Sequence, residues 1–588
     1  MLACSSNIRN FVSLHLLLFE PGCGALMLCH LFITFLFAVL LEKLLWSCPD
    51  IGDIYLLVRD KKGKDLQTRV DDLAFSRVKR DVPGYLNKIR AMAGDCSIQG
   101  LGLSQQDRNI LVSEVNVVFH VAATVRFSEP LPLALAVNVR ATKDMIDLAR
   151  EMKNLESFVH VSTAFSQCYG STLEERFYET PMDPMTLLDF VQTANPDIID
   201  TITPSLIGKW PNTYTFTKAL AEDFLRVHGV GMPLGIFRPS IGKHNQLHFN
   251  ALPIPLAMQY KLYQAVADLG GGTGARAPPQ TVFLCTVETP SHNPKTTVVR
   301  IIKKFENYSV VSMRFSFFLL LLIFIVMMYL LYLLVVSSLE EPVPRWVDNW
   351  YGVSGFITAC GTGLLRAVRA NRQGVANVVP VDMCINGLIA AAWDVADRFK
   401  DIKTGVVLPT SRDIRFYNYV LGDRHITWGE IYDTTVLHAK FTCPPSRALW
   451  YTVLFMQPGA RVHQIARFFL HYIPGLLADT ASVCIGRKAE FLKLYAKIDM
   501  LEDVTVFFST QTWNFSNVNM PKLLARMSTE DRKLYFCDMG QIHWVEFLKL
   551  VYCLLFDPQP APWNRFGEGE IIRFYHLGQV QIYSYVHR

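Results

Sequence analysis

Four short apolar runs separated by helical patterns are the feature that most constrains the fold of this chain. The runs occupy residues 54–58, 115–121, 158–161 and 234–237. Helical patterns lie between them, notably at 133–153 and 218–228. Uninterrupted apolar runs are typical of strands buried on both faces of a parallel sheet. Because strands that alternate with helices indicate an α/β fold, we predict a Rossmann-like, doubly wound parallel sheet.

Small or polar residues follow each of these runs and mark the expected binding edge of the sheet. They are Arg59 after the first run, Ala122 and Ala123 after the second, Ser162 and Thr163 after the third, and Pro239 and Ser240 after the fourth. Ligands of open parallel sheets bind at the carboxyl ends of the strands. Alanine at such an end would let a flat ligand approach the backbone.

A tyrosine and a lysine four positions apart, Tyr214 and Lys218, open a predicted helix. Residues at i and i+4 share one helix face, so the Lys218 ammonium can lie beside the Tyr214 phenol. A cation in that position favours the phenolate and lets tyrosine exchange a proton near neutral pH. This is the acid/base chemistry of a carbonyl reductase, although the same spacing is also common on solvated helix surfaces.

The candidate catalytic residues and several longer segments resemble a known enzyme family. Ser162-Thr163 followed by Tyr214-x-x-x-Lys218 resembles the catalytic set of the extended short-chain dehydrogenase/reductases. The segments 41–45, 54–64, 160–165, 210–222, 238–241, 341–349 and 379–382 resemble fatty acyl-CoA reductases. Residues 416–556 resemble the male-sterility domain of that family, through 417–419, 426–430 and 468–474. We predict a reductase domain at 37–241 and 335–410 and a mainly helical C-terminal domain at 411–556.

The resemblance implies that the chain converts a long-chain fatty acyl-CoA into a fatty alcohol with two molecules of NADPH. It implies that Tyr214 and Thr163 stabilise and protonate the oxyanion that forms at the thioester carbonyl. Ser162 is the alternative hydroxyl. Lys218 would lower the pKa of Tyr214 and hold the nicotinamide ribose.

Further residues are assigned to the cofactor site. Arg59 stands where an acidic residue would bind a free ribose 2′-hydroxyl, so a cation there favours a 2′-phosphate and NADPH over NADH. Asp95 would face the adenine, and Asn138 would hold a water or a backbone carbonyl near the site. A solvated surface charge for Arg59 and a structural role for Asn138 are the alternatives. The other candidates lie at strand ends: Ala122, Ala123, Pro239 and Ser240.

The amino terminus departs from the family pattern. The family opens with a strand and a turn of the form T-G-x-T-G-x-x-G, but this register reads Thr34-Phe35-Leu36-Phe37, without glycine. Glycine lets backbone N–H groups approach the cofactor pyrophosphate. We therefore predict that residues 1–36 are an atypical N-terminus that lacks the first strand and the glycine turn, with Phe37 in the phosphate position. The apolar stretch 26–46 could also act as a signal anchor.

Residues 242–334 have no counterpart in the family. Joining Ile241 directly to Val335 gives the continuous family sequence. The insertion closes with the apolar run 315–336, which is long enough for a transmembrane helix. A translated intron or mis-joined exon is the alternative that we favour. Residues 557–588 also diverge and are predicted to be an unstructured or mis-joined tail.

Composition narrows the possible partners. Hydrophobic residues make up 51% of the chain, above the norm for soluble domains, and segment 448–484 is apolar enough to enter a membrane or line an acyl tunnel. The net charge of +5 is small and dispersed, so we predict no nucleic-acid partner. The 13 cysteines form no C-x-x-C pair and the 15 histidines no H-E-x-x-H motif, so we predict no metal. We expect membrane lipid as a partner, at the endoplasmic reticulum or peroxisome, with the catalytic domain facing the cytosol.

Three functions remain open at this point. The leading prediction is a membrane-associated fatty acyl-CoA reductase. Another extended reductase or epimerase would share the site but not the C-terminal domain. A non-catalytic relative would explain the missing glycine turn, and cofactor binding separates it from the first possibility.

Overall fold

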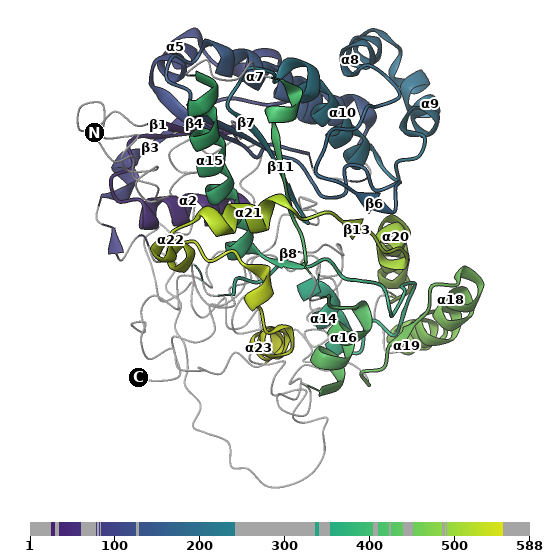
Figure 1. Cartoon of the computed structure of the whole chain (residues 1–588). Helices are drawn as coiled ribbons and strands as arrows, with labels where there is room; N and C mark the ends of the chain where they lie inside the picture. Colours follow the sequence, from purple (N-terminus) through teal and green to yellow (C-terminus); the bar gives the residue numbers. More distant parts are fainter. Residues whose placement is uncertain are drawn as a thin grey trace, which may run out of the picture.

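The structure, a computed structural model, describes residues 25–29, 35–59, 78–240, 335–341, 353–403, 410–438, 451–484 and 489–556, with short gaps inside several of these ranges. The first half of the described chain surrounds a central sheet, and most of the C-terminal helices lie below it in the view of Figure 1.

A seven-stranded parallel sheet forms the centre of the fold, in the order β11-β7-β5-β4-β1-β2-β3. Its strands are β1 (Ala25–Cys29), β2 (Ile54–Val58), β3 (Ile89–Ala93), β4 (Val115–His120), β5 (Ser157–Val161), β7 (Leu234–Pro239) and β11 (Arg415–Tyr419). Every residue of β2, β5 and β7 is buried, as expected for strands covered on both faces. The predicted doubly wound α/β fold is therefore confirmed.

The first strand of the fold is present as β1, which corrects the prediction that residues 1–36 lack this strand. Strand β1 pairs in parallel with both β2 and β4, and so lies near the middle of the sheet. Its sequence, ALMLC, is uniformly apolar, which suits a strand buried on both faces. The strand is thus present although the glycine pattern that normally follows it is not. Residues 30–34, where the turn would lie, are outside the described part and contain no glycine.

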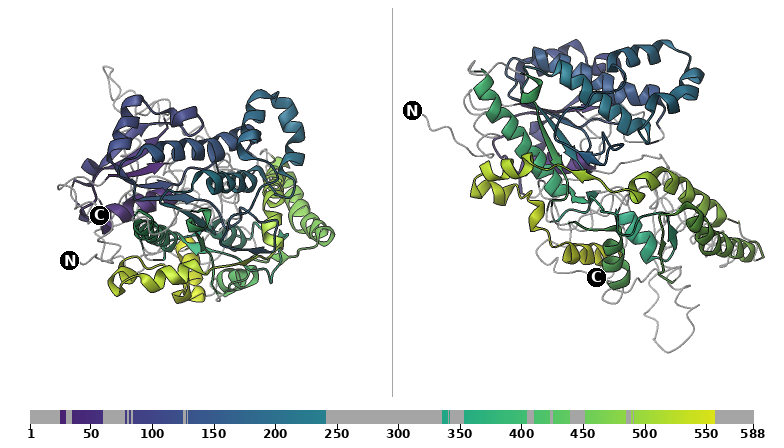
Figure 2. Two further views of the ribbon diagram at one scale, coloured as in Figure 1. Left: turned by 45° about the horizontal axis from the view of Figure 1, so that its top comes forward. Right: turned by 45° about the vertical axis from the view of Figure 1, so that its right-hand side comes forward.

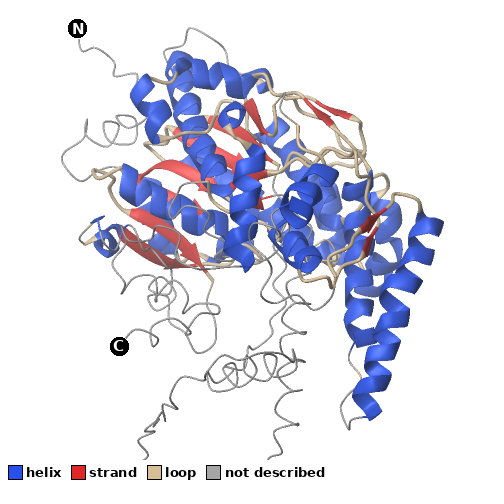
Figure 3. Ribbon diagram, turned by 90° about the horizontal axis from the view of Figure 1, so that it is seen from below, coloured by secondary structure: helices blue, strands red, loops and turns tan. Residues whose placement is uncertain are grey.

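Helices cover both faces of the sheet (Figure 3). On one face, α2 (Phe35–Ser47) and α15 (Val381–Lys403) contribute to the largest hydrophobic cluster. On the other face, α5 (Gln105–Glu114), α7 (Ala141–Glu151) and α10 (Thr213–His228) form a second cluster with the strands. A third cluster joins α10 to α6 (Leu131–Leu135), α8 (Pro184–Thr193) and α9 (Pro196–Ile207). The short turns of this half are η1 (Tyr85–Lys88), η2 (Gln99–Gly102) and the π-helical η3 (Ala136–Arg140).

The C-terminal half is mainly helical, as predicted. Its helices are α14 (Val353–Gly361), α16 (Trp428–Tyr432), α18 (Ala460–Arg467), α19 (Ile473–Cys484), α20 (Phe491–Thr510), α21 (Asn519–Arg526), α22 (Thr529–Leu534) and α23 (Trp544–Phe556). Shorter turns are η4 (Ser411–Asp413), η5 (Asp433–His438), η6 (Phe468–Tyr472) and η7 (Met539–Gln541). Thr427 and Glu430 form a capping box at the start of α16.

The predicted boundary at residue 411 needs a correction, because the chain crosses back into the sheet after it. Strand β11 pairs in parallel with β7 along its whole length. Its central residue Tyr417 is fully buried, so the strand is part of the reductase core. Two-residue strands add further links: β6 (Thr172–Leu173) pairs with β13 (Asn514–Phe515), and β9 (Ala367–Val368) pairs with β12 (Phe455–Met456).

The whole predicted insertion 242–334, and the tail 557–588, fall outside the described residues. The two last residues of the predicted transmembrane run form strand β8 (Val335–Val336), which pairs with β10 (Val379–Pro380), so the run does not continue as a helix to residue 336. Among the helices that the structure describes, none has both the length and the apolar character needed to cross a bilayer.

Candidate active site

Helix α10 places Tyr214 and Lys218 on one buried face, as the spacing predicts. The side chain of Asn212 caps the helix by accepting a hydrogen bond of 2.9 Å from the backbone N–H of Thr215. The Lys218 Nζ donates a hydrogen bond of 2.7 Å to the carbonyl oxygen of Val161. Since Val161 is the last residue of β5, the lysine lies at the carboxyl end of the sheet.

The two hydroxyls that follow β5 point to different partners. The Thr163 hydroxyl is fully buried and hydrogen-bonds Tyr214. The Ser162 Oγ instead donates a hydrogen bond of 2.5 Å to Glu222 Oε1. Consecutive residues in extended backbone face opposite sides, which explains the separation. The structure therefore brings Thr163, and not Ser162, to the phenol of Tyr214.

Burial controls the protonation of the site. It raises the pKa of Tyr214 well above its usual value, although the hydrogen bond from Thr163 acts in the opposite direction. Burial also lowers the pKa of Lys218 to about 7, and the Glu222 carboxylate partly counteracts this shift. Lys218 was predicted to lower the pKa of Tyr214, but desolvation is the larger effect and raises it. Both groups are removed from water, and desolvation disfavours the charged form of each.

A buried ion pair, which sequence reasoning missed, supports this site. Glu222 lies one turn beyond Lys218 on α10 and accepts hydrogen bonds of 2.8 Å and 2.6 Å from the guanidinium of Arg238. Both side chains are almost completely buried. Arg238 also stacks over the ring of Phe416 at 4.2 Å. The i, i+4 spacing of Lys218 and Glu222 was a visible signal, but the partner on β7 was not.

Asn138 links the second strand end to α10. Its Oδ1 accepts a hydrogen bond of 2.9 Å from the backbone N–H of Thr124. Its Nδ2 donates one of 2.8 Å to the hydroxyl of Thr217, the residue before Lys218. Asn138 lies in the π-helical turn η3, a conformation that is frequent at functional sites. Asn138 is thus bonded both to the segment after β4 and to the α10 residue that precedes Lys218.

Two histidines, also missed, lie side by side on neighbouring strands beneath the site. His120 on β4 is in register with His160 on β5, and their ring centroids are 5.2 Å apart. His120 Nε2 lies 3.1 Å from the Thr142 hydroxyl. Burial, and the nearby charge of Lys218, lower the pKa of His160 well below its usual value. Both histidines are therefore buried, and His160, which interacts electrostatically with the lysine, is uncharged.

The cofactor-binding candidates at the other strand ends differ in their exposure and in their hydrogen-bond partners. Arg59 is about half exposed and pairs with Asp95, at 2.7 Å between Nε and Oδ2. Ala122 and Ala123 are buried at the end of β4. Pro239 ends β7, and the fully buried Ser240 donates its hydroxyl hydrogen to the carbonyl oxygen of Asn377. Ser240 therefore holds the segment before β10 and does not present its hydroxyl at the sheet edge.

The residues fit one end of a nicotinamide dinucleotide better than the other. Tyr214, Lys218 and Thr163 form a cluster suited to a nicotinamide ribose and a reacting carbonyl. At the pyrophosphate end, the segment 30–34 supplies no glycine, and the Phe37 ring is buried in the main hydrophobic core. A glycine cradle is therefore absent from the sequence at the turn that would form it. Among the described residues no cluster of His, Cys, Asp or Glu could hold a metal ion.

Comparisons with known proteins agree with this arrangement. Two family profiles, both described as male sterility protein, match residues 34–244 with 326–388, and residues 470–554. The first match is interrupted inside the segment predicted as an insertion. Fatty acyl-CoA reductase wat of Drosophila melanogaster is 30% identical over 537 residues, covering 89% of this chain and 83% of that protein. Human fatty acyl-CoA reductase 1 is 30% identical over 531 residues, covering 88% and 81%.

Among solved structures, the terminal R domain from the myxalamid PKS-NRPS biosynthetic pathway aligns with a TM-score of 0.49 at 15% identity and covers 91% of each chain. The first of the two family profiles, at 34–244 and 326–388, is an NAD-binding profile. Together with the parallel sheet and the reductase relatives, it defines a nicotinamide-dependent reductase. Within that class, the chain belongs to the fatty acyl-CoA reductase family, which confirms the predicted resemblance.

Proposed function

We propose that the chain reduces a long-chain fatty acyl-CoA to the fatty alcohol, with NADPH as the reductant. The observation that carries the proposal is the buried cluster of Tyr214, Thr163 and Lys218 at the carboxyl end of β5, in a chain of this family. A bound nicotinamide cofactor would supply the hydride.

The protein residues would act on the carbonyl oxygen. Tyr214 and Thr163 would donate hydrogen bonds to this oxygen as negative charge develops on it. Burial keeps Tyr214 protonated, so the phenol can act as the acid. The tetrahedral hemithioacetal would then expel the CoA thiol and leave an aldehyde, and a second hydride with a second proton from Tyr214 would give the alcohol.

Lys218 would orient the site through its charge and its bond to Val161. Its lowered pKa of about 7 allows the group to change charge near neutral pH. Glu222 and Asn138 would position it, through charge and through Thr217 respectively. The preference for NADPH rests on Arg59 at the end of β2, where a guanidinium suits a phosphate.

The proposal is tested by feeding palmitoyl-CoA and NADPH to the purified chain and measuring aldehyde and alcohol by mass spectrometry. Tyr214→Phe should reduce product formation by about a hundredfold or more, while NADPH binding, measured by calorimetry, changes little. Alcohol formed at the unaltered rate by Tyr214→Phe would refute the role given to the phenol.

A second candidate function follows from one observation, the absence of glycine between β1 and α2. It is a non-catalytic relative that keeps the fold and does not hold the pyrophosphate. Absence of measurable NADPH binding, in a chain shown to be folded by circular dichroism, would favour this alternative.

We further propose that the protein is membrane-associated at the endoplasmic reticulum or peroxisome, with the reductase domain facing the cytosol. Long-chain acyl-CoA and fatty alcohol both partition into bilayers, so a membrane location brings substrate to the site. Protease treatment of intact organelles should cleave the reductase domain if it faces the cytosol, and full protection would contradict this orientation.

A further inference from the structure

The run α18–η6–α19, residues 460–484, is one continuous helical segment that we call the arm helix. It packs against α20 and extends away from the body of the protein (Figures 2 and 3). At its far end, Asp479 caps α20 by accepting hydrogen bonds from the backbone N–H groups of Phe491 and Leu492, at 2.8 Å and 3.0 Å. These contacts hold the arm helix and α20 together as a pair.

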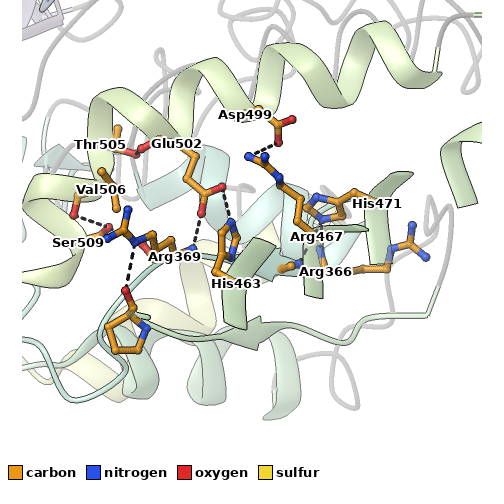
Figure 4. Close-up of polar contacts among 12 residues, drawn as sticks. Arg366, Arg369, His463, Arg467, His471, Asp499, Glu502, Thr505, Val506 and Ser509 are labelled. Atoms are coloured by element: carbon orange, nitrogen blue, oxygen red, sulfur yellow. Dashed lines mark hydrogen bonds and ion pairs between the residues drawn. The ribbon is translucent and has the colours of Figure 1, made fainter. Parts of the chain in front are cut away.

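The inner face of the arm helix is polar. His463 Nε2 lies 2.8 Å from Glu502 Oε2, and Arg467 pairs with Asp499 at 3.2 Å (Figure 4). His471 Nε2 accepts hydrogen bonds from the backbone N–H groups of Arg366 and Ala367, at 3.1 Å and 3.2 Å. Positions 463, 467, 471, 475 and 479 follow an i, i+4 row, so one continuous stripe of the helix makes these inward contacts.

The outer face of the arm helix is apolar. Seven large hydrophobic side chains on it are each 47% to 65% exposed: Val462, Ile465, Phe468, Phe469, Leu476, Leu477 and Val483. Over the 21 intervals from the first to the last of them, the face is about 30 Å long. A surface helix of a soluble domain normally has the opposite arrangement, so this face is built to meet an apolar partner.

The charges around the arm identify the kind of partner. Among the described residues of the arm helix and α20, the carboxylates Asp479, Asp499 and Glu502 are buried and Asp503 is exposed, whereas Arg461, Lys493 and Lys497 are exposed cations. The exposed charged side chains described on this helix pair are thus three cations and one carboxylate. An apolar face on a helix pair with this excess of positive charge complements an anionic lipid surface. A second copy of this chain would bring the same positive charges together.

We propose that the outer face of the arm helix docks on an anionic lipid bilayer and lies in the plane of its headgroup and acyl boundary. The inference deepens the proposed function, since it locates the surface through which a membrane-associated reductase would meet lipid. The arm helix does not cross the bilayer, because its inner face remains bonded to α20 and to residues 366–367.

The test measures binding of the full chain to vesicles by flotation, without acyl-CoA or cofactor, so that the result is independent of reductase activity. The double variant Ile465→Ser with Leu476→Ser should bind vesicles of phosphatidylcholine and phosphatidylserine about tenfold more weakly. The matched control, Ile98→Ser with Ile198→Ser, removes two side chains of comparable exposure elsewhere and should bind normally. Arg461→Gln with Lys493→Gln should remove the preference for anionic over neutral vesicles.

Hydrogen–deuterium exchange with and without vesicles locates the contact. Vesicles should slow exchange in 460–484 of the unaltered chain and not in the double variant. Vesicle protection confined to other segments, such as 315–334, would overturn the proposal. So would a dimer, seen by mass photometry without lipid, that the double variant dissociates. Normal alcohol formation without vesicle binding would refute the docking surface alone, whereas vesicle binding without reduction would refute only the proposed reaction.

Discussion

The hydroxyl of Ser162 donates a hydrogen bond of 2.5 Å to the carboxylate of Glu222. Because that carboxylate also pairs with buried Arg238, the serine belongs to a structural network and not to the reacting centre. The neighbouring Thr163 is left as the hydroxyl that meets Tyr214.

This relationship separates the roles of the two hydroxyls. Thr163→Val should lower the turnover of acyl-CoA by about tenfold to a hundredfold, because a donor to the developing oxyanion is lost, with little change in melting temperature. Ser162→Ala should mainly destabilise the fold, by about 1–3 kcal/mol, since Glu222 loses a buried partner. Steady-state kinetics and thermal unfolding on both variants check the assignment, and the reverse pattern would contradict it.

Lys218 should impose a pH dependence on stability. Its pKa of about 7 in the folded protein lies below the value of about 10.4 in an unfolded chain. The unfolded state therefore binds more protons between these values, and stability rises with pH across this window. Lys218→Met should remove this contribution, which amounts to on the order of 4 kcal/mol over the whole window. If the free energy of unfolding had the same pH dependence in the two proteins from pH 7 to pH 10, the lysine would not be buried as described.

His471 should make the protein sensitive to mild acid. Burial lowers its pKa to about 3, below the unfolded value of about 6.5, so stability falls as pH drops below 6.5. At pH 5 the loss from this group is about 2 kcal/mol. His471→Gln should reduce the difference in melting temperature between pH 7.5 and pH 5, and the exposed control His228→Gln should not. An unchanged difference in His471→Gln would argue against a neutral buried ring.

Arg59 should select the phosphorylated cofactor. Arg59→Ala should lower kcat/KM for NADPH by about tenfold to a hundredfold and leave NADH nearly unaffected, because only the former has a 2′-phosphate for the guanidinium. Arg90→Ala is a suitable control, since Arg90 is also exposed and pairs with an aspartate, at 3.1 Å from Asp53. Equal effects of Arg59→Ala on both cofactors would refute this role.

The turn between β1 and α2 should limit cofactor affinity. We expect the chain to bind NADPH weakly, because residues 30–34 provide no glycine for close approach of backbone N–H groups to the pyrophosphate. Supplying a glycine-rich turn there, together with deletion of 242–334, should increase NADPH binding and alcohol formation at least about tenfold. Deletion of 242–334 alone, the control, should leave NADPH binding weak. Tight NADPH binding by the unmodified chain would show that this turn holds pyrophosphate by other means.

The sequence predicted those parts of the fold that depend on apolar runs and on helix periodicity. The runs at β2, β4, β5 and β7, and the shared face of Tyr214 and Lys218, were readable because burial and helix period act over a few residues. Strand β1 was missed because its glycine turn, the usual signal, is absent. The Glu222–Arg238 pair joins helix α10 to strand β7, and β11 returns to the sheet beside β7. Both depend on which elements become neighbours in the fold, and the sequence of either segment alone does not encode that. The inward polar stripe of the arm helix was missed for a similar reason, since its partners lie at 366–367 and on α20.

The position of β11 at the edge of the sheet has a consequence for folding during synthesis. Until residues 415–419 leave the ribosome, β7 remains an edge strand with an open row of backbone donors and acceptors, since its partner on that side is β11. Such an edge is a template for pairing with other chains. A nascent chain must therefore carry this unfinished edge through the synthesis of all residues between 239 and 415, and products that stop in that interval are the ones most exposed to aggregation.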